Sequence, residues 1–270
     1  MTGRAQNSVP WLALVIGNTR LHWAAFDGDH LCATWHTSHL TSQQVAPLLA
    51  NLGDQQQWIA LGVTPPRLPN ATPLYLASVV GAQAELWQDY PHLHTVALER
   101  LPLRNLYSTL GIDRALNLLG AGDRYGWPVL VVDGGTALTF TAGDDQTLIG
   151  GAILPGMGLQ FKALGTETAE LPDVHLAGAE PPRWADSTAD AIRSGVFWGQ
   201  RAAVLDAAMT WWQEYPQGNV VITGGDGPQI YASLETLSSK ANLHHDPELA
   251  FLGIKAYRRG ALGEIDLAPQ

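Results

Sequence analysis

The sequence predicts an α/β protein built from two similar halves, and three glycine-rich turns lead to this prediction. The turns are Gly17-Asn18-Thr19, Asp133-Gly134-Gly135-Thr136 and Thr223-Gly224-Gly225, and each follows a short apolar run typical of a buried strand. Residues 15–23 align with residues 133–141, glycine on glycine, which indicates an internal repeat. We therefore expect two duplicated α/β domains, each a mixed sheet flanked by helices.

The first half is predicted to begin with three strands, at residues 11–16, 21–26 and 31–36, after a loose tail over residues 1–9. A helix capped by Thr41 or Ser42 runs to Leu49. The elements expected next are a strand at 58–63 parallel to the first, a strand within 74–80, a helix starting at 82–87 and a short strand at 94–98. Residues 104–110 form a loop, and a largely apolar helix opens at Gly111 and runs to about Tyr125.

The second half is predicted to start over with three strands between residues 129 and 153. Helices are expected at 157–164 and at 186–214, the latter interrupted or bent near Ser194-Gly195. A strand at 219–222 leads into the third glycine turn, and a helix near 228–237 follows. Residues 245–252 are predicted as a connection and residues 253–260 as the last helix.

We predict domains over residues 1–125 and 126–270, with a ligand bound between them.

The composition excludes some classes of protein. The net charge is −10, which argues against nucleic-acid binding, since phosphate backbones require a basic surface. There is one cysteine, so no disulfide can form within the chain, and no apolar run reaches the roughly 18 residues of a membrane span. The polar N-terminus lacks the apolar core of a signal peptide, and we expect a cytoplasmic protein without nucleic-acid or membrane partners.

The second turn suits a phosphate and its metal ion. Its glycines let backbone N–H groups approach phosphate oxygens, Thr136 adds a donor, and Asp133 can hold a cation. An ordinary β-hairpin with a glycine turn explains the same residues equally well when they are considered alone.

The order and spacing of several motifs resemble the type III pantothenate kinase family and the related Bvg accessory factors. The matching segments, which cover most of the chain, are Gly17-Asn18-Thr19, Ser78-Val79-Val80, Gly111-Ile112-Asp113-Arg114, Asp133-Gly134-Gly135-Thr136, Gly150-Gly151-Ala152-Ile153-Leu154-Pro155-Gly156, Thr168-Ala169-Glu170-Leu171-Pro172, Ser187-Thr188-Ala189-Asp190 and Thr223-Gly224-Gly225. The resemblance implies two ribonuclease H-like domains of the actin, Hsp70 and sugar-kinase type. It also implies ATP-dependent phosphorylation of pantothenate to 4′-phosphopantothenate, with Mg²⁺, a monovalent cation (K⁺ or NH₄⁺) and a homodimer.

The resemblance assigns the acceptor site to Gly111, Ile112, Asp113, Arg114 and Thr188. Asp113 would be the general base, although an acid that only stabilises a helix N-terminus is the alternative. Arg114 would hold the anionic substrate or organise Asp113, and a surface ion pair is the alternative. Thr188 would contact substrate, within one subunit or across the dimer, or cap a helix.

The resemblance assigns ATP binding to all three turns. The residues are Val15, Ile16, Gly17, Asn18, Thr19, Arg20, Leu21 and His22 in the first turn, Thr136 in the second, and Gly224 and Gly225 in the third. Asp133 would bind the metal. Thr136 could instead bond the local backbone.

One departure from the family pattern bears on activity. The first motif of the family normally has an acid where this chain has Val15, and Thr141 also stands where many members have an acid. Either the metal is held through phosphates, water and Asp133, or the protein is a weak or inactive kinase that serves as an accessory or regulatory factor. The histidine pairs His92/His94 and His244/His245 are interpreted as solvated loop residues rather than metal ligands.

Overall fold

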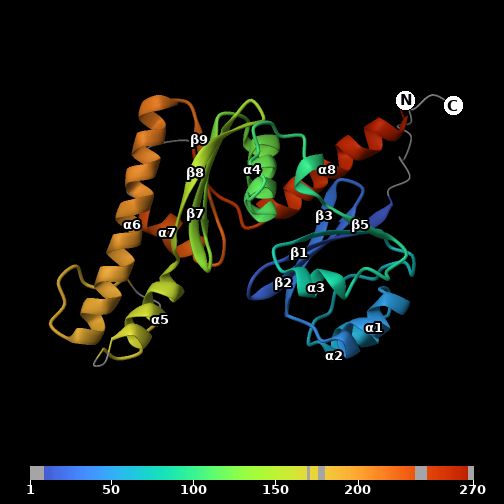
Figure 1. The fold of residues 1–270 in the computed structure, drawn as a ribbon, viewed down its shortest axis with the longest axis horizontal. Coiled ribbons are helices and arrows are strands. Elements are labelled where there is room, and N and C mark those ends of the chain that lie inside the picture. The colour runs from blue at the N-terminus through green and yellow to red at the C-terminus, as the bar shows by residue number, and fades with distance from the viewer. Residues whose placement is uncertain (1–8, 169–170, 176–179, 235–241, 267–270) are drawn as a thin grey trace. The chain divides into compact units, whose positions relative to one another are not determined.

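The computed structural model describes residues 9–168, 171–175, 180–234 and 242–266 (Figure 1). The chain forms two compact units. Unit 1 comprises Met1–Pro102, Leu106–Gly120 and Ala250–Gln270, and unit 2 comprises Leu103–Asn105 and Ala121–Leu249. The first eight residues of the predicted tail, and residues 235–237 of the predicted helix, lie outside the described residues. The domain split after residue 125 stays a prediction.

The two sheets have the same topology. Unit 1 has the strand order β3-β2-β1-β4-β5, and unit 2 has β8-β7-β6-β9-β10. In each, an antiparallel meander of three strands is followed by two parallel strands. The predicted α/β class with two duplicated, mixed sheets is therefore confirmed.

Unit 1 holds most of the elements predicted for the first half. They are β1 (Pro10–Ile16), β2 (Arg20–Asp27), β3 (His30–Ser38), α1 (Ser42–Ala50), α2 (Gln55–Ala60), β4 (Leu74–Ser78), α3 (Gly81–Glu85), β5 (Leu93–Thr95) and the 3-10 turn Leu98–Arg100, with α4 (Ile112–Tyr125) and α8 (Leu249–Asp266) each lying mainly in this unit. Thr41 caps α1 through a capping box with Gln44, as the sequence predicts.

The strand predicted at residues 58–63 is wrong. Asp54 caps a short helix there by accepting a hydrogen bond from the Gln56 N–H (2.9 Å), and Trp58 is carried into the core. Trp58 meets the rings of Trp23 and Trp35 edge-on. A short helix can bury Trp58 in this way through a single apolar face, without pairing with a strand of the sheet. The parallel neighbour of β1 is β4.

Unit 2 is built on β6 (Val129–Gly134), β7 (Ala137–Asp144), β8 (Thr147–Pro155), β9 (Asn219–Thr223) and β10 (Leu243–His245), with α5 (Met157–Glu167), α6 (Thr188–Glu214) and α7 (Gly227–Leu234). Its core joins strand residues such as Val132 and Ile222 to Val204, Trp211 and Trp212 of α6.

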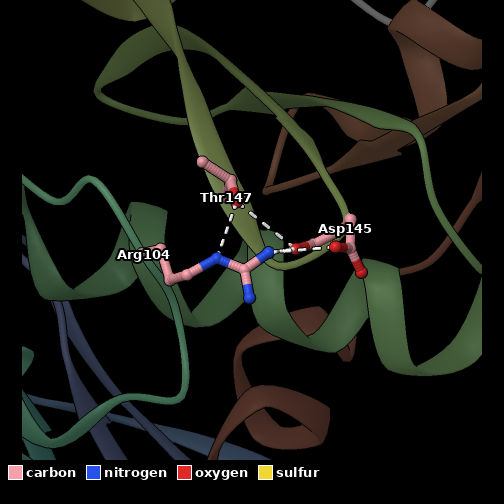
Figure 2. Close-up of polar contacts among 3 residues, drawn as sticks. All are labelled: Arg104, Asp145 and Thr147. Atoms are coloured by element: carbon pink, nitrogen blue, oxygen red, sulfur yellow. Dashed lines mark hydrogen bonds and ion pairs between the residues drawn. The ribbon is translucent and has the colours of Figure 1, made fainter.

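Residues 103–105 belong to unit 2 because Arg104 is held by the β7–β8 turn (Figure 2). Its guanidinium donates to Thr147 Oγ1 (3.0 Å) and pairs with the Asp145 carboxylate (3.0 Å). Its backbone pairs in parallel with Thr147. Because the ion pair is exposed, the backbone bonds account for most of this attachment.

Two further predictions need correction. Helix α6 (Figure 1) runs without interruption from Thr188 to Glu214, so the interruption considered near Ser194-Gly195 is wrong. Ser194 Oγ donates to the Arg183 carbonyl (2.9 Å). The connection predicted at residues 245–252 is restricted to residues 246–248. Leu243–His245 forms β10, and α8 begins at Leu249, because Leu249, Phe251 and Leu252 form a buried apolar turn before Gly253.

Candidate functional site

The first turn connects β1 to β2 in unit 1. Val15 and Ile16 end β1 and are buried, whereas Asn18 and Thr19 are exposed. The Gly17 N–H bonds the Arg20 carbonyl (3.0 Å), which closes the turn. Arg20, Leu21 and His22 open β2, and Leu21 is fully buried. The turn thus presents its backbone and the Asn18 and Thr19 side chains to solvent.

The second turn lies between two other backbone segments of unit 2. The Gly156 N–H donates to the Thr136 carbonyl (3.0 Å), and the Asp226 N–H donates to the Gly134 carbonyl (2.8 Å). A Cβ on Gly156 would collide with the Gly135 carbonyl oxygen. The second turn is therefore fixed from both sides, and glycine at 156 is required by this approach.

The third turn places Gly224 directly against Asp133. A side chain at Gly224 would collide with the Asp133 carboxylate, and Gly224 has φ +87°, a conformation that favours glycine. Gly225 is exposed with open space around its Cα. The structure thus brings Asp133, Gly134 and Gly224 together, two turns that are some 90 residues apart in sequence becoming one surface.

Asp133 also has hydroxyl neighbours. It pairs with Thr139 on β7 and with Thr223 on β9, and paired residues of neighbouring strands point to the same face. A carboxylate with two neighbouring hydroxyls offers the oxygen ligands that Mg²⁺ and K⁺ accept. Within the described ranges no cluster of three or more His, Cys, Asp or Glu side chains could hold a metal ion alone. Any cation at Asp133 would therefore share its coordination with water or a ligand.

Asp226 is a second carboxylate beside this turn, and the sequence reasoning did not select it. Burial raises the pKa of its carboxyl, and its Cβ lies 3.2 Å from the position of a Cβ on Gly134. The sequence patterns also do not indicate the close contact between Gly156 and the Gly135 carbonyl. Asp226 could have been selected from the sequence, because it directly follows the third glycine turn.

The acceptor segment opens α4 in unit 1. Gly111 precedes the helix, Ile112 begins it, and Asp113 lies in its first turn, half-exposed, with a carboxylate oxygen accepting the Arg114 N–H (2.8 Å). Arg114 is only 6% exposed and donates to the Tyr107 hydroxyl (3.0 Å). The burial of Arg114 excludes the surface ion pair considered for it, and Asp113 is the partly exposed charged residue of the motif.

Thr188 is exposed at the first residue of α6, in unit 2. The helix cap is its neighbour Ser187, whose hydroxyl accepts the Asp190 N–H (3.2 Å). The capping role considered for Thr188 is therefore wrong.

The interpretation of both histidine pairs as loop residues is wrong for His94, which lies in β5, and for His244 and His245, which lie partly buried in β10. His94 stacks on Tyr75, and His244 stacks on Tyr125 and bonds the Asn219 side chain (3.0 Å). Thr141 is buried in β7.

Among the helices that the structure describes, none combines the length and apolar character required to cross a bilayer.

Comparisons with known proteins place these residues in a family. The model of the type III pantothenate kinase family matches residues 11–209. A type III pantothenate kinase of Nostoc sp. is 44% identical over 261 residues, covering 93% of this chain and 95% of the relative. One of Thermosynechococcus vestitus is also 44% identical, covering 96% and 94%.

Solved structures agree on the fold. A Campylobacter jejuni protein named for the Baf family of transcriptional activators has a TM-score of 0.62 at 19% identity, covering 93% of this chain and 99% of that one. A Sinorhizobium meliloti protein named as a 2-dehydro-3-deoxygalactonokinase has a TM-score of 0.52 at 16% identity, covering 96% and 98%. The duplicated sheets thus share the fold of these two solved structures. The match to the family model and the 44% identities show that the chain belongs to the type III pantothenate kinase family.

Proposed function

We propose that this protein transfers the γ-phosphoryl group of ATP to the hydroxyl of pantothenate, giving 4′-phosphopantothenate and ADP in the first step of coenzyme A biosynthesis. The observation that carries the proposal is the 44% identity to type III pantothenate kinases over nearly the full length of both chains. The accessible Asp113 beside the buried Arg114 supports it.

In the proposed reaction the pantothenate hydroxyl oxygen forms a bond to the γ-phosphorus, and the bond from that phosphorus to the β–γ bridging oxygen breaks. Asp113 accepts the hydroxyl proton, a role that contributes about 10²–10⁴-fold to rate in enzymes. In this proposal Arg114, which donates to the Tyr107 hydroxyl, orients the pantothenate carboxylate or Asp113.

The glycine turns bind ATP in this proposal. In the first turn, Asn18 and Thr19 donate to phosphate oxygens, and Thr136 does so in the second turn, while Gly224 and Gly225 contact the nucleoside. Asp133, with Thr139 and Thr223, holds a cation, Mg²⁺ or a monovalent K⁺ or NH₄⁺. A bound Mg²⁺ would supply charge neutralisation at the phosphates.

Two finer features belong to the same proposal. The protein acts as a homodimer, and Thr188 contacts pantothenate of the partner copy. Its exposure at the start of α6 supports this assignment, because the helix cap does not require its side chain.

The test is production of 4′-phosphopantothenate, detected by mass spectrometry, from purified protein with ATP, pantothenate, Mg²⁺ and either K⁺ or NH₄⁺. We expect product with wild type and none above background with Asp113→Asn. Absence of product under all these conditions would reject the kinase and leave the accessory or regulatory role.

A further inference from the structure

Two of the passages of the chain between the units lie inside helices. The chain leaves unit 1 at residues 120–121, within α4, and returns to it at residues 249–250, in the first turn of α8 (Figure 1). A helix is stiff over a few turns, because each turn is hydrogen-bonded to the next. The ends of α4 and α8 that belong to unit 2 therefore bear on how freely the two units move against each other.

One buried carboxylate contacts both of these helix ends. Asp246 lies between β10 and α8, and its side chain is only 4% exposed. Its Oδ2 accepts a hydrogen bond from the Tyr125 hydroxyl (3.1 Å) and pairs with Arg124 Nη1 (3.4 Å), which are the last two residues of α4. Its Oδ1 accepts the Glu248 N–H (2.9 Å), directly before α8. Asp246 thus joins the C-terminus of α4 to the N-terminus of α8 within unit 2.

The capping of α8 explains only part of this arrangement. An aspartate followed by a proline is a common start of a helix, because the carboxylate accepts an N–H two residues later and Pro247 has a fixed φ. That role uses one carboxylate oxygen, and an exposed Ser or Asn would fill it equally well. The second oxygen, the arginine pair and the burial of Asp246 instead serve the contact with α4.

Tyr125 is itself attached to the sheet of unit 2. Its ring stacks on that of His244 in β10, with 4.3 Å between the centroids, and its carbonyl accepts an N–H of the Asn219 side chain (3.0 Å). Burial, followed by the charge of the Asp246 carboxylate, raises the pKa of Tyr125 to about 12. The hydroxyl therefore keeps its proton at neutral pH and remains a donor to Asp246.

The same two helices are in close contact within unit 1. A Cβ on Gly253 of α8 would collide with the Leu116 carbonyl oxygen of α4. Such close packing leaves the helices little room to slide, because protein interiors are dense and barely compressible. Helices α4 and α8 are therefore held together at Gly253 in unit 1 and at Asp246 in unit 2.

We propose that Asp246 is a positioning residue, which limits the motion between the two units by tying the ends of α4 and α8 together. Because the first turn of α4 carries Asp113, the constraint acts on the proposed base through the helix. This part of the inference rests on the proposed phosphoryl transfer, which uses Asp113 of unit 1 and Asp133 of unit 2. Such a reaction is sensitive to motion between the units, since a displacement of about 1 Å can lower a rate by about 10²-fold.

The first test measures the motion by double electron–electron resonance without substrates. One spin label is attached to Cys32, the exposed and sole cysteine, in unit 1, and the other to Gln213→Cys on the exposed end of α6 in unit 2. An excess of unlabelled protein restricts the signal to pairs within one chain. We expect the distance distribution to broaden with Tyr125→Phe, which removes only a hydroxyl, and with Asp246→Asn, which removes the charge.

Two matched controls should keep the wild-type width. Asp145→Asn also removes a carboxylate from an arginine pair, but that carboxylate is 86% exposed and such pairs contribute little. Tyr231→Phe changes the tyrosine beside His245, the neighbour of His244 on β10. If Asp246 only stabilises unit 2, Asp246→Asn lowers the melting temperature and leaves the distance distribution of the folded protein unchanged. That result, or equal broadening in Asp145→Asn, would overturn the proposal.

Enzyme kinetics supplies a second readout. With Tyr125→Phe and Asp246→Asn we expect kcat for 4′-phosphopantothenate formation, per folded molecule, to fall by about 10–10²-fold. The KM for pantothenate should stay near the wild-type value, because the first turn of α4 is unchanged. An active enzyme whose two variants keep the wild-type kcat would contradict the positioning role.

These outcomes are separable from the proposed function. If the wild-type protein makes no 4′-phosphopantothenate, the kinase proposal fails, and the distance distributions still decide whether Asp246 limits the motion. If the wild-type protein is active and both variants keep its distance distribution, only the role of Asp246 is refuted.

Discussion

At the scale of single residues, the candidate site depends on small groups in fixed places. Asp113 remains accessible while its neighbour Arg114 is buried, and Gly224 leaves room for the Asp133 carboxylate. Each can be tested by changing a few atoms.

Asp113→Asn removes the proposed base while preserving size and helix position. We expect kcat for 4′-phosphopantothenate formation to fall by about 10²-fold or more, with the melting temperature nearly unchanged. Asp123→Asn, an exposed position on the same helix, is the control. Equal loss in both variants would show that helix stability, not proton transfer, is being measured.

Gly224→Ala is expected to destabilise the protein by about 1–3 kcal/mol, because the new Cβ meets Asp133 and φ +87° strains any L side chain. Activity should fall with it. The neighbouring Gly225→Ala has open space and should cost much less. Chemical denaturation of both variants checks this, and similar free energies of unfolding would contradict the close approach.

At the scale of elements, helix packing explains where the chain departs from prediction. Helix α8 packs its Gly253 against the backbone of α4, where a Cβ would collide with the Leu116 carbonyl oxygen. The glycine that the sequence suggested as a helix start is thus an interior residue that permits close helix approach.

Gly253→Ala should therefore destabilise unit 1, by about 1–3 kcal/mol as for other overpacked sites. Gly260→Ala, in the same helix with nothing within 4 Å, should stabilise by up to about 1 kcal/mol through helix propensity. Thermal unfolding followed by circular dichroism separates the two, and a stabilising Gly253→Ala would show that the helices do not approach so closely.

At the scale of the whole molecule, buried histidines should make stability depend on pH. The folded protein holds the pKa of His22 at about 4, below its ordinary 6.5. Between these values the unfolded chain binds a proton that the folded chain does not, so the free energy of unfolding falls as the pH drops from 6.5 to 4 and is level above 6.5. Burial lowers the pKa of His36, His94 and His244 in the same direction.

His22→Gln removes one of these contributions. Its melting temperature should decline less between pH 7 and pH 5 than that of wild type. The raised pKa values of Asp226 and Glu248 act in the opposite direction but are common to both proteins. Parallel melting curves against pH would contradict a neutral, buried His22.

The sequence alone determined the fold class, the family and the strands and helices next to each motif. These features can be predicted from sequence because apolar periodicity and glycine turns are patterns formed by residues close together in the chain. It failed at residues 58–63, where tryptophan packing overrides strand propensity, and at the start of α8, where a glycine inside a helix imitates a boundary.

Only the tertiary structure decided which distant residues meet. Contact between Gly224 and Asp133 depends on β6 pairing with β9, and the place of His22 depends on one extra residue in the first turn. Strand register and turn length are long-range properties of a sheet, and no local pattern encodes them. The motifs were therefore readable in the sequence, whereas the contacts between them became visible only in the paired strands.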